Sequence, residues 1–91
     1  MADDDASARA LARAFGKKVR ELREVRGWSQ SRMGAEVGLQ RTYINAVENG
    51  GRNVTLATIG RFARAFGLSL ETLFASVSAD ATQDSDKEGM R

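Results

Sequence analysis

The polar side chains with the clearest chemical pattern lie within residues 40–45. Gln40, Arg41, Thr42 and Asn45 fall in this short stretch, and Arg41 and Asn45 are four residues apart, which on a helix places them on one face. Arg41 can donate two parallel hydrogen bonds to guanine O6 and N7, and Thr42 can bond a base or place its methyl group against thymine. Gln40 and Asn45 can bond a base or a phosphate, and for Arg41 the alternative is a phosphate contact without base specificity.

Four further side chains extend this predicted DNA-binding set. Tyr43 is expected to place its hydroxyl on the sugar–phosphate backbone, and Arg52 and Asn53 follow in a glycine-containing loop that we expect to lie along the DNA. Gln30 stands at the start of a predicted helix, where backbone N–H groups and the helix dipole attract phosphate. The alternative for Gln30 is a simple polar surface residue.

The composition argues against the commonest forms of enzyme chemistry. The chain has no histidine and no cysteine. It therefore lacks the usual general base, the usual zinc ligands and a thiol nucleophile. We predict no enzyme activity, no cofactor and no metal site. No stretch approaches the apolar length of a membrane span, and the acidic start is unlike a signal peptide, so we expect a cytoplasmic protein without membrane contact.

The net charge of +2 conceals an uneven distribution. Of the 14 basic residues, only Lys87 and Arg91 lie outside residues 6–75, whereas seven of the 12 acidic residues lie outside that stretch. Residues 6–75 therefore carry a formal charge of +7, which is the sign that a phosphate-binding surface requires. The alternative is that these basic residues only solvate helix surfaces.

The stretch from Trp28 to Gly50 predicts two short helices joined by a tight turn. Ser29 can cap the first with its hydroxyl, and Gly38 can end it in the left-handed conformation. The second helix is expected over about Gln40–Glu48. Apolar residues at helical spacing give both helices an inner face, namely Met33, Val37, Ile44 and Val47. Two short helices around a glycine-containing turn, the second with a polar outer face, indicate a helix-turn-helix.

Three further helices are predicted around this motif. The first spans about Arg9 to Arg26, the fourth follows a Thr55 cap from Leu56 to Phe66, and the last runs from Ser69 to about Ala75. The apolar stripe of the first comprises Leu11, Phe15, Val19 and Leu22, and that of the fourth comprises Leu56, Ile59, Ala63 and Phe66. The predicted fold is a compact all-α, five-helix bundle. Residues 1–7 are expected to form a flexible acidic arm, residues 8–75 the domain, and residues 76–91 a disordered polar tail.

The chain also resembles a known family, the phage-repressor/Cro type of helix-turn-helix regulators, whose fold is called lambda-repressor-like. The resemblance lies in the run from Arg20 to Gln30, the turn Glu36 to Leu39 and the segment Ile44 to Gly50. Arg41 to Ile44 and Arg52 to Thr55 are most similar to the controller proteins of restriction–modification systems. One departure is Gly34, where the family usually has alanine, and we expect a slightly weaker helix there.

The resemblance implies roles for several residues. Arg23 is expected to form a partly buried ion pair with Glu48 that fixes the recognition helix against the first helix. Gln30 is expected to bind a DNA phosphate. Arg41 and Thr42 are expected to read bases.

Apolar side chains are concentrated in the last third of the predicted domain. Part of this set must close the core, and the rest is expected to form a two-fold dimer interface, as members of the family commonly pair through their last helices. The alternative is that the whole set is core. The predicted dimer residues are Phe62, which lies off the stripe of its helix, and Leu68, Leu70, Leu73 and Phe74.

The sequence therefore predicts a homodimeric regulator of transcription that binds double-stranded DNA at a palindromic operator, of the controller type. The alternative is an antitoxin-like interaction module that binds a partner protein as well as DNA. RNA polymerase would be a further partner if the protein activates transcription, and repression would need only occupancy of the operator.

Overall fold

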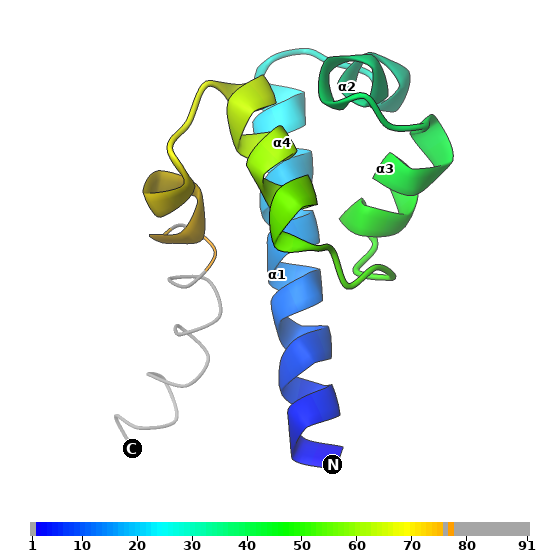
Figure 1. Ribbon diagram of the computed structural model, residues 1–91. Coiled ribbons are helices and arrows are strands. Elements are labelled where there is room, and N and C mark those ends of the chain that lie inside the picture. The colour runs from blue at the N-terminus through cyan, green and yellow to red at the C-terminus, as the bar shows by residue number, and fades with distance from the viewer. Residues whose placement is uncertain (1, 76, 78–91) are drawn as a thin grey trace.

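The computed structural model describes residues 2–75 and 77, with side chains from residue 6 onward (Figure 1). The chain forms the helices α1 (Ala2–Val25), α2 (Gln30–Val37), α3 (Arg41–Glu48) and α4 (Leu56–Phe66). Residues 70–75 are also helical, as is Val77. The described residues contain no β-strand, so the predicted all-α fold with a helix-turn-helix is confirmed.

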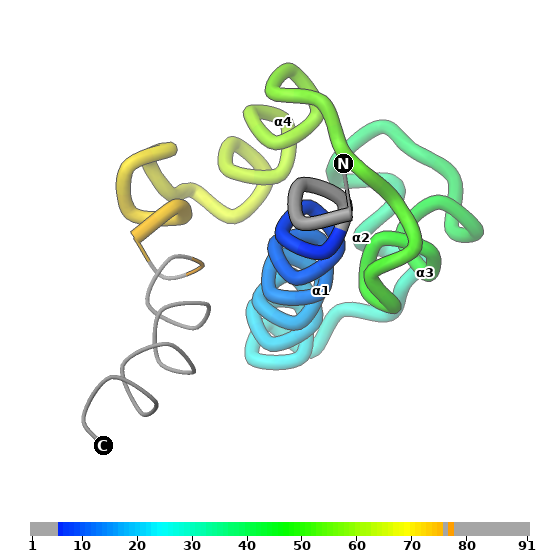
Figure 2. The backbone as a smooth tube through the Cα atoms, turned by 90° about the horizontal axis from the view of Figure 1, so that it is seen from below, coloured from blue at the N-terminus to red at the C-terminus, as the bar shows by residue number. Residues whose placement is uncertain are grey.

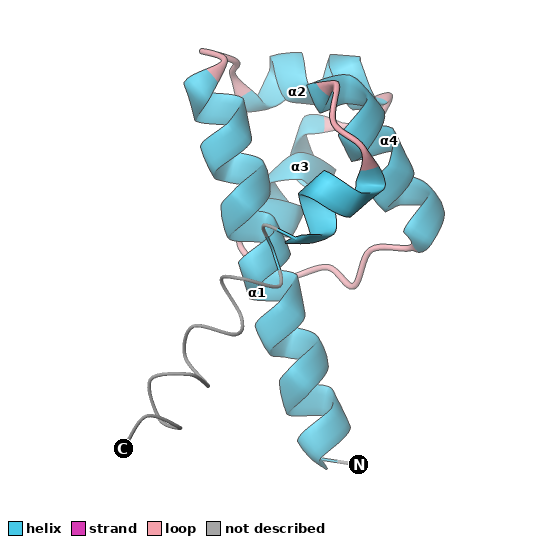
Figure 3. Ribbon diagram, turned by 90° about the vertical axis from the view of Figure 1, so that its left-hand side faces the viewer, coloured by secondary structure: helices cyan, strands magenta, loops and turns pink. Residues whose placement is uncertain are grey.

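The long helix α1 is the centre around which the other elements lie. Seen along its axis, α2 and α3 are on one side of it and the helical residues 70–75 are on the other (Figure 2). Its N-terminal half extends beyond the other described helices (Figure 3). The helix-turn-helix therefore rests on the C-terminal half of α1.

Polar side chains begin three of the elements where the sequence predicts them. The Ser29 hydroxyl accepts a hydrogen bond from the backbone N–H of Arg32 at 2.9 Å. Thr55 caps α4 in the same way, and Ser69 accepts from the N–H of Thr72 at 3.0 Å. Each such bond satisfies an amide that has no partner within the helix, and is worth about 1 kcal/mol.

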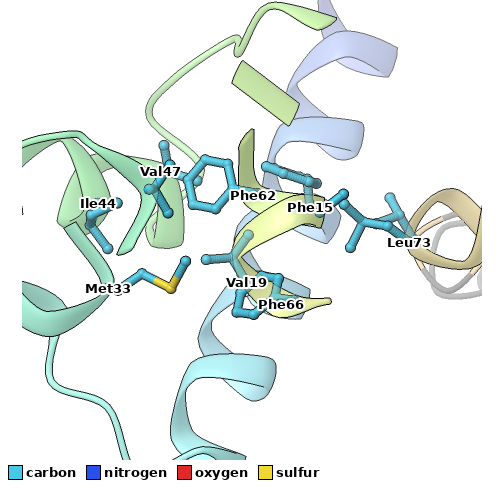
Figure 4. Packing of buried hydrophobic residues seen from close by; sticks show 11 residues of the cluster. Phe15, Val19, Met33, Ile44, Val47, Phe62, Phe66 and Leu73 are labelled. Carbon is cyan, nitrogen blue, oxygen red and sulfur yellow. The ribbon is translucent and has the colours of Figure 1, made fainter. Parts of the chain in front are cut away.

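The core joins the helix-turn-helix to the rest of the fold. Phe62 of α4 is fully buried at its centre, with Val47 of α3 on one side and Phe15 of α1 on the other (Figure 4). The rings of Phe62 and Phe15 meet edge to face, with their centroids 5.6 Å apart. Leu73 and Val77 close the far end of the cluster.

Gly16 lies where α3 crosses α1. A Cβ atom at this position would lie 2.1 Å from the backbone oxygen of Val47 and 3.0 Å from that of Glu48. The missing side chain of Gly16 is therefore what lets the C-terminal end of α3 touch α1.

Gly34 plays the same part inside the helix-turn-helix. A Cβ atom there would lie 2.5 Å from the carbonyl oxygen of Leu39, in the turn before α3. The Gly34 carbonyl also accepts from the N–H groups of Gly38 and Leu39, both at 2.8 Å. With glycine at position 34, the turn before α3 can pack closely against α2.

The ends of the fold differ from the prediction. The first helix begins at Ala2, not at about Arg9, so residues 2–7 of the expected arm are helical. An alanine-rich start without glycine or proline gives the helix no reason to stop there. Val77 is buried, so the folded part reaches two residues beyond the expected boundary at residue 75. The rest of the predicted tail, residues 76 and 78–91, lies outside the described residues.

The predicted dimer set also needs correction. Phe62 and Leu73 are fully buried in the protomer, so neither side chain is available to a second copy. Phe62 lies off the apolar stripe of α4 and was included in the dimer set, but the buried face of α4 is broader than one stripe. Leu56, at the first position of α4, is instead 67% exposed.

Within the described residues, no helix combines the length and the apolar character that crossing a membrane would require.

Candidate nucleic-acid interface

Helix α3 presents two contrasting faces. Ile44 and Val47 are buried at 0% and 1% exposure, and they attach the helix to the core. The opposite face is exposed along its length, and it holds four predicted DNA-binding residues, Gln40, Arg41, Thr42 and Asn45. Gln40 is the N-cap of α3 but makes no side-chain cap bond, so its amide is not engaged at the helix end.

Arg23 and Glu48 form the ion pair that the resemblance implies. Arg23 Nε donates to Glu48 Oε2 at 2.6 Å, and Nη2 donates to Oε1 at 3.1 Å. The third guanidinium contact, from Nη1 to the carbonyl oxygen of Trp28, is 2.7 Å long. The side chains are 12% and 3% exposed, and the hydrogen bond to Glu48 raises the pKa of Arg23 above its ordinary value. One guanidinium thus ties α1, the segment before α2 and the end of α3 together.

Gln30 occupies the first position of α2, as predicted, but its amide points to α3. Gln30 Nε2 donates to Asn45 Oδ1 and to Glu48 Oε1, both at 3.1 Å. An amide nitrogen has two hydrogens, so both donors of Gln30 are used within the protein. The phosphate contact of this side chain stays a prediction, and its donors already have partners within the protein.

Tyr43 and Arg52 are brought together by the loop after α3. The Arg52 guanidinium lies over the Tyr43 ring, with its carbon 4.9 Å from the ring centroid. Tyr43 is half-buried against the core, while Arg52 and Asn53 are exposed. Stacking on an aromatic ring restrains the arginine beside α3, where a phosphate contact is predicted.

Arg26 is a positioning residue that the sequence analysis missed. Its guanidinium donates to the carbonyl oxygens of Leu22 at 3.1 Å and Phe66 at 2.6 Å, near the C-terminal ends of α1 and α4. It also lies over the rings of Phe66 and Trp28, which stack on each other with centroids 6.3 Å apart. Cations are favoured at helix C-termini, but a sequence pattern cannot show that two such ends meet.

Trp28 packs in an aromatic cluster just before α2. Val25 is 83% exposed and takes no part in the cluster, whose aromatic member is Phe66. Arg32 covers the Trp28 ring at 5.2 Å from its centroid. Trp28 therefore packs as an apolar plug against Phe66.

Among the described residues, no group of three acidic side chains is placed to hold a metal ion. The exposed face of α3 and the Arg52 loop carry side chains suited to phosphates and base edges.

A family model described as helix-turn-helix matches residues 19–73, which is more than half of the chain. This protein therefore belongs to the helix-turn-helix family, of the Cro/C1 type. Within that family it is 36% identical over 67 residues to control protein C.MunI from a Mycoplasma species. The match covers 72% of this chain and 90% of that relative.

Solved structures lead to the same group. The restriction-modification controller protein C.AhdI from Aeromonas hydrophila is 39% identical, with a TM-score of 0.65 over 68% of this chain and 94% of that one. The controller protein C.Esp1396I, solved as a tetramer with its natural 35-base-pair operator, has a TM-score of 0.71 at 21% identity. Its match covers 78% of this chain and 93% of that one, and it shows likeness of fold alone.

Proposed function

We propose that this protein is a transcription regulator of the restriction–modification controller type, which binds a specific duplex DNA sequence through α3. The observation that carries the proposal is the exposed polar face of α3, held in place by the buried Arg23–Glu48 pair. The first residues of such a helix enter the major groove, where base pairs present distinct patterns of donors and acceptors.

In this proposal, Arg41 and Thr42 read bases, and Gln40 and Asn45 bind bases or phosphates. The Tyr43 hydroxyl, Arg52 and Asn53 contact the DNA backbone. Affinity comes largely from neutralised phosphates, which the charge of +7 on residues 6–75 favours.

We further propose that the protein acts as a symmetric dimer. Leu70 and Phe74 are 40% and 37% exposed in the protomer, and Leu68 is half-buried beside them in the chain. Leu11 of α1 was expected in the core but is 52% exposed, and it lines the same hollow as Phe74. These side chains form an apolar surface that a second copy would cover. Two heads related by a two-fold axis fit an inverted repeat with half-sites about 10–10.5 bp apart.

The relatives named above give no support to the alternative of an antitoxin. They are control and controller proteins, and the helix-turn-helix family is one of transcription regulators. RNA polymerase would be a partner only if the protein activates transcription.

The proposal is tested by incubating the purified protein with fragmented genomic DNA of its source and sequencing the bound fragments. The enriched fragments are then fused to a reporter gene, and expression is measured with and without the protein. We expect fragments that share an inverted repeat and a reporter that responds, with the sign of the response distinguishing activation from repression. Random fragments, or a reporter that does not respond, would contradict the proposal.

A further inference from the structure

A chain of hydrogen bonds runs from the buried ion pair to the exposed face of α3. Glu48 Oε1 accepts from Arg23 Nη2 and from Gln30 Nε2, each at 3.1 Å. The same Gln30 nitrogen donates to Asn45 Oδ1, also at 3.1 Å. Gln30 begins α2, whereas Asn45 and Glu48 belong to α3, so the chain links two helices that pack together (Figure 1).

The chemistry of the groups determines the direction of every bond in this chain. A carboxylate only accepts hydrogen bonds, so the end of the Gln30 amide that faces Glu48 must be the NH₂ group. The second hydrogen of that NH₂ needs an acceptor, so Asn45 must turn its oxygen to Gln30. Glu48, where this series of hydrogen bonds begins, is 3% exposed and is held by Arg23, so its carboxylate cannot rotate.

The outer end of the chain is therefore a donor. With its oxygen directed to Gln30, Asn45 turns its NH₂ group away from the protein interior, and the residue is exposed. Asn45 lies one turn after Arg41 on α3, so its NH₂ group stands on the face assigned to the major groove.

We propose that Gln30 is a positioning residue that fixes Asn45 as a hydrogen-bond donor toward one base of the operator. This inference rests on the proposed function. A free asparagine recognises adenine through both of its polar atoms, accepting from N6 and donating to N7. With its oxygen directed to Gln30, Asn45 turns its N–H groups to the DNA, so it favours an acceptor such as guanine O6 or N7, or thymine O4. It disfavours cytosine, whose major-groove edge presents an amino donor.

The same geometry argues against a phosphate contact by the side chain of Gln30. Both N–H groups of Gln30 are engaged, and only its oxygen remains, which a phosphate would repel. The backbone N–H groups at the start of α2 are the part of this helix end that suits a phosphate.

The first step of the test is selection of binding sites from random duplex DNA by the wild-type protein and by Asn45→Ala. We expect one position of the half-site to lose its preference in the variant, which identifies the base pair opposite Asn45. If the wild-type protein enriches no sequence at all, the proposed function fails. If it enriches a motif that Asn45→Ala leaves unchanged, only the present inference fails.

The second step is competition binding with four duplexes that differ only at that base pair. The wild-type protein should favour guanine or thymine over cytosine by about 3- to 10-fold, as expected for one hydrogen bond. Asn45→Asp keeps the acceptor for Gln30 but replaces the outward NH₂ by an oxygen, so it should reverse the preference toward cytosine. Gln83→Glu makes the same amide-to-carboxylate change outside the described residues and should keep the wild-type preference.

Gln30→Met tests the positioning role itself. It removes the bond to Asn45, so the preference should fall to within about two-fold and adenine should gain relative to guanine. The salt dependence of binding and the far-UV circular dichroism should stay as in the wild type. An equal loss of affinity for all four duplexes with a smaller salt slope would overturn the inference, because it would make Gln30 a phosphate contact.

Discussion

In the part of the chain that the structure describes, Arg41 is not held in place by neighbouring side chains. It is exposed on α3, and no ion pair or side-chain hydrogen bond restrains it among the described residues. Its five donors are therefore available to DNA. Arg52, in contrast, is restrained by the ring of Tyr43. This difference leads to different predictions for the two arginines.

Arg41→Ala should relax the base preference at one position of each half-site. The loss of a bidentate contact to guanine should cost about 1–3 kcal/mol on the preferred sequence and much less on sequences that lack the base. Fluorescence anisotropy with a panel of single-substitution duplexes measures this directly. An equal loss on every duplex would make Arg41 a phosphate contact.

Arg52→Ala should weaken binding on all sequences to a similar extent. Removing one phosphate contact should reduce the slope of log K against log salt by about 1. Arg64→Ala makes the same charge change on α4, where no DNA contact is proposed, and should leave the slope nearly as it is. A slope in Arg52→Ala equal to that of Arg64→Ala would reject the phosphate role.

The helices pack through close backbone contacts that only glycine allows. Gly16 brings α3 against α1, and Gly34 brings the turn against α2. Both positions lie in helices, where alanine has the higher intrinsic propensity by about 1 kcal/mol. Glycine at these two positions therefore lowers the intrinsic stability of α1 and α2, but it allows the close packing that positions α3.

Gly16→Ala should destabilise the protein although it improves helix propensity. The added Cβ atom would meet the Val47 oxygen at 2.1 Å, and helix backbone on both sides cannot yield easily. Gly60→Ala is the matched control, because nothing lies within 4 Å of its added carbon in α4. Gly60→Ala should raise the free energy of unfolding by about 0.5–1 kcal/mol. Urea denaturation that finds both variants stabilised would contradict the close packing of α1 and α3.

Glu48→Gln should be among the most destabilising changes of a single charged residue. It leaves the Arg23 guanidinium largely buried without its counter-charge, at a cost of about 3–5 kcal/mol for a well-buried pair. Because the pKa of Arg23 is raised, its charge contributes stability that is lost only as pH rises through that raised value. Arginine stays protonated throughout the ordinary pH range, so raising the pH there should not relieve the variant.

The control for Glu48→Gln is Glu24→Gln. Glu24 pairs with Arg20 on the exposed side of α1, where both side chains are more than half exposed. This variant should change the free energy of unfolding by about 0–1 kcal/mol. Thermal unfolding of both variants compares their losses of stability. Equally small losses would show that the Arg23–Glu48 pair does not support the fold.

The sequence predicted those elements whose signals are local. The caps Ser29, Thr55 and Ser69 and the glycine stop at Gly38 all lie where they were expected, because each acts within one helical turn. The Arg23–Glu48 pair was predicted only through the resemblance, since 25 residues separate its partners. The bonds from Gln30 to Asn45 and from Arg26 to Phe66 were missed, because they depend on how helices meet.

At the scale of the whole molecule, burial separates the apolar side chains that form the core of the protomer from those that remain available to a partner. Phe62 and Leu73 are core, whereas Leu11, Leu70 and Phe74 remain partly exposed near the C-terminal end of the described fold. Periodicity could not make this division, because core and interface residues have the same composition and spacing. The proposed dimer uses the exposed group.

Phe74→Asp should produce a folded monomer that has lost most of its affinity for the operator. A charge at the proposed interface opposes association, and a single head makes only half of the contacts. Leu56→Asp is the control, since Leu56 is 67% exposed at the start of α4 and has no proposed role. Analytical ultracentrifugation that finds Phe74→Asp as dimeric as Leu56→Asp would place the interface elsewhere.

The most direct test of the account is selection of binding sites from random duplex DNA at near-physiological salt, followed by sequencing. The account predicts an inverted repeat with half-sites centred about 10–10.5 bp apart, one half-site for each recognition helix. Selected DNA without any common motif would show that charge alone binds it, and would contradict a reading role for α3. A single motif without inverted symmetry would contradict the symmetric dimer.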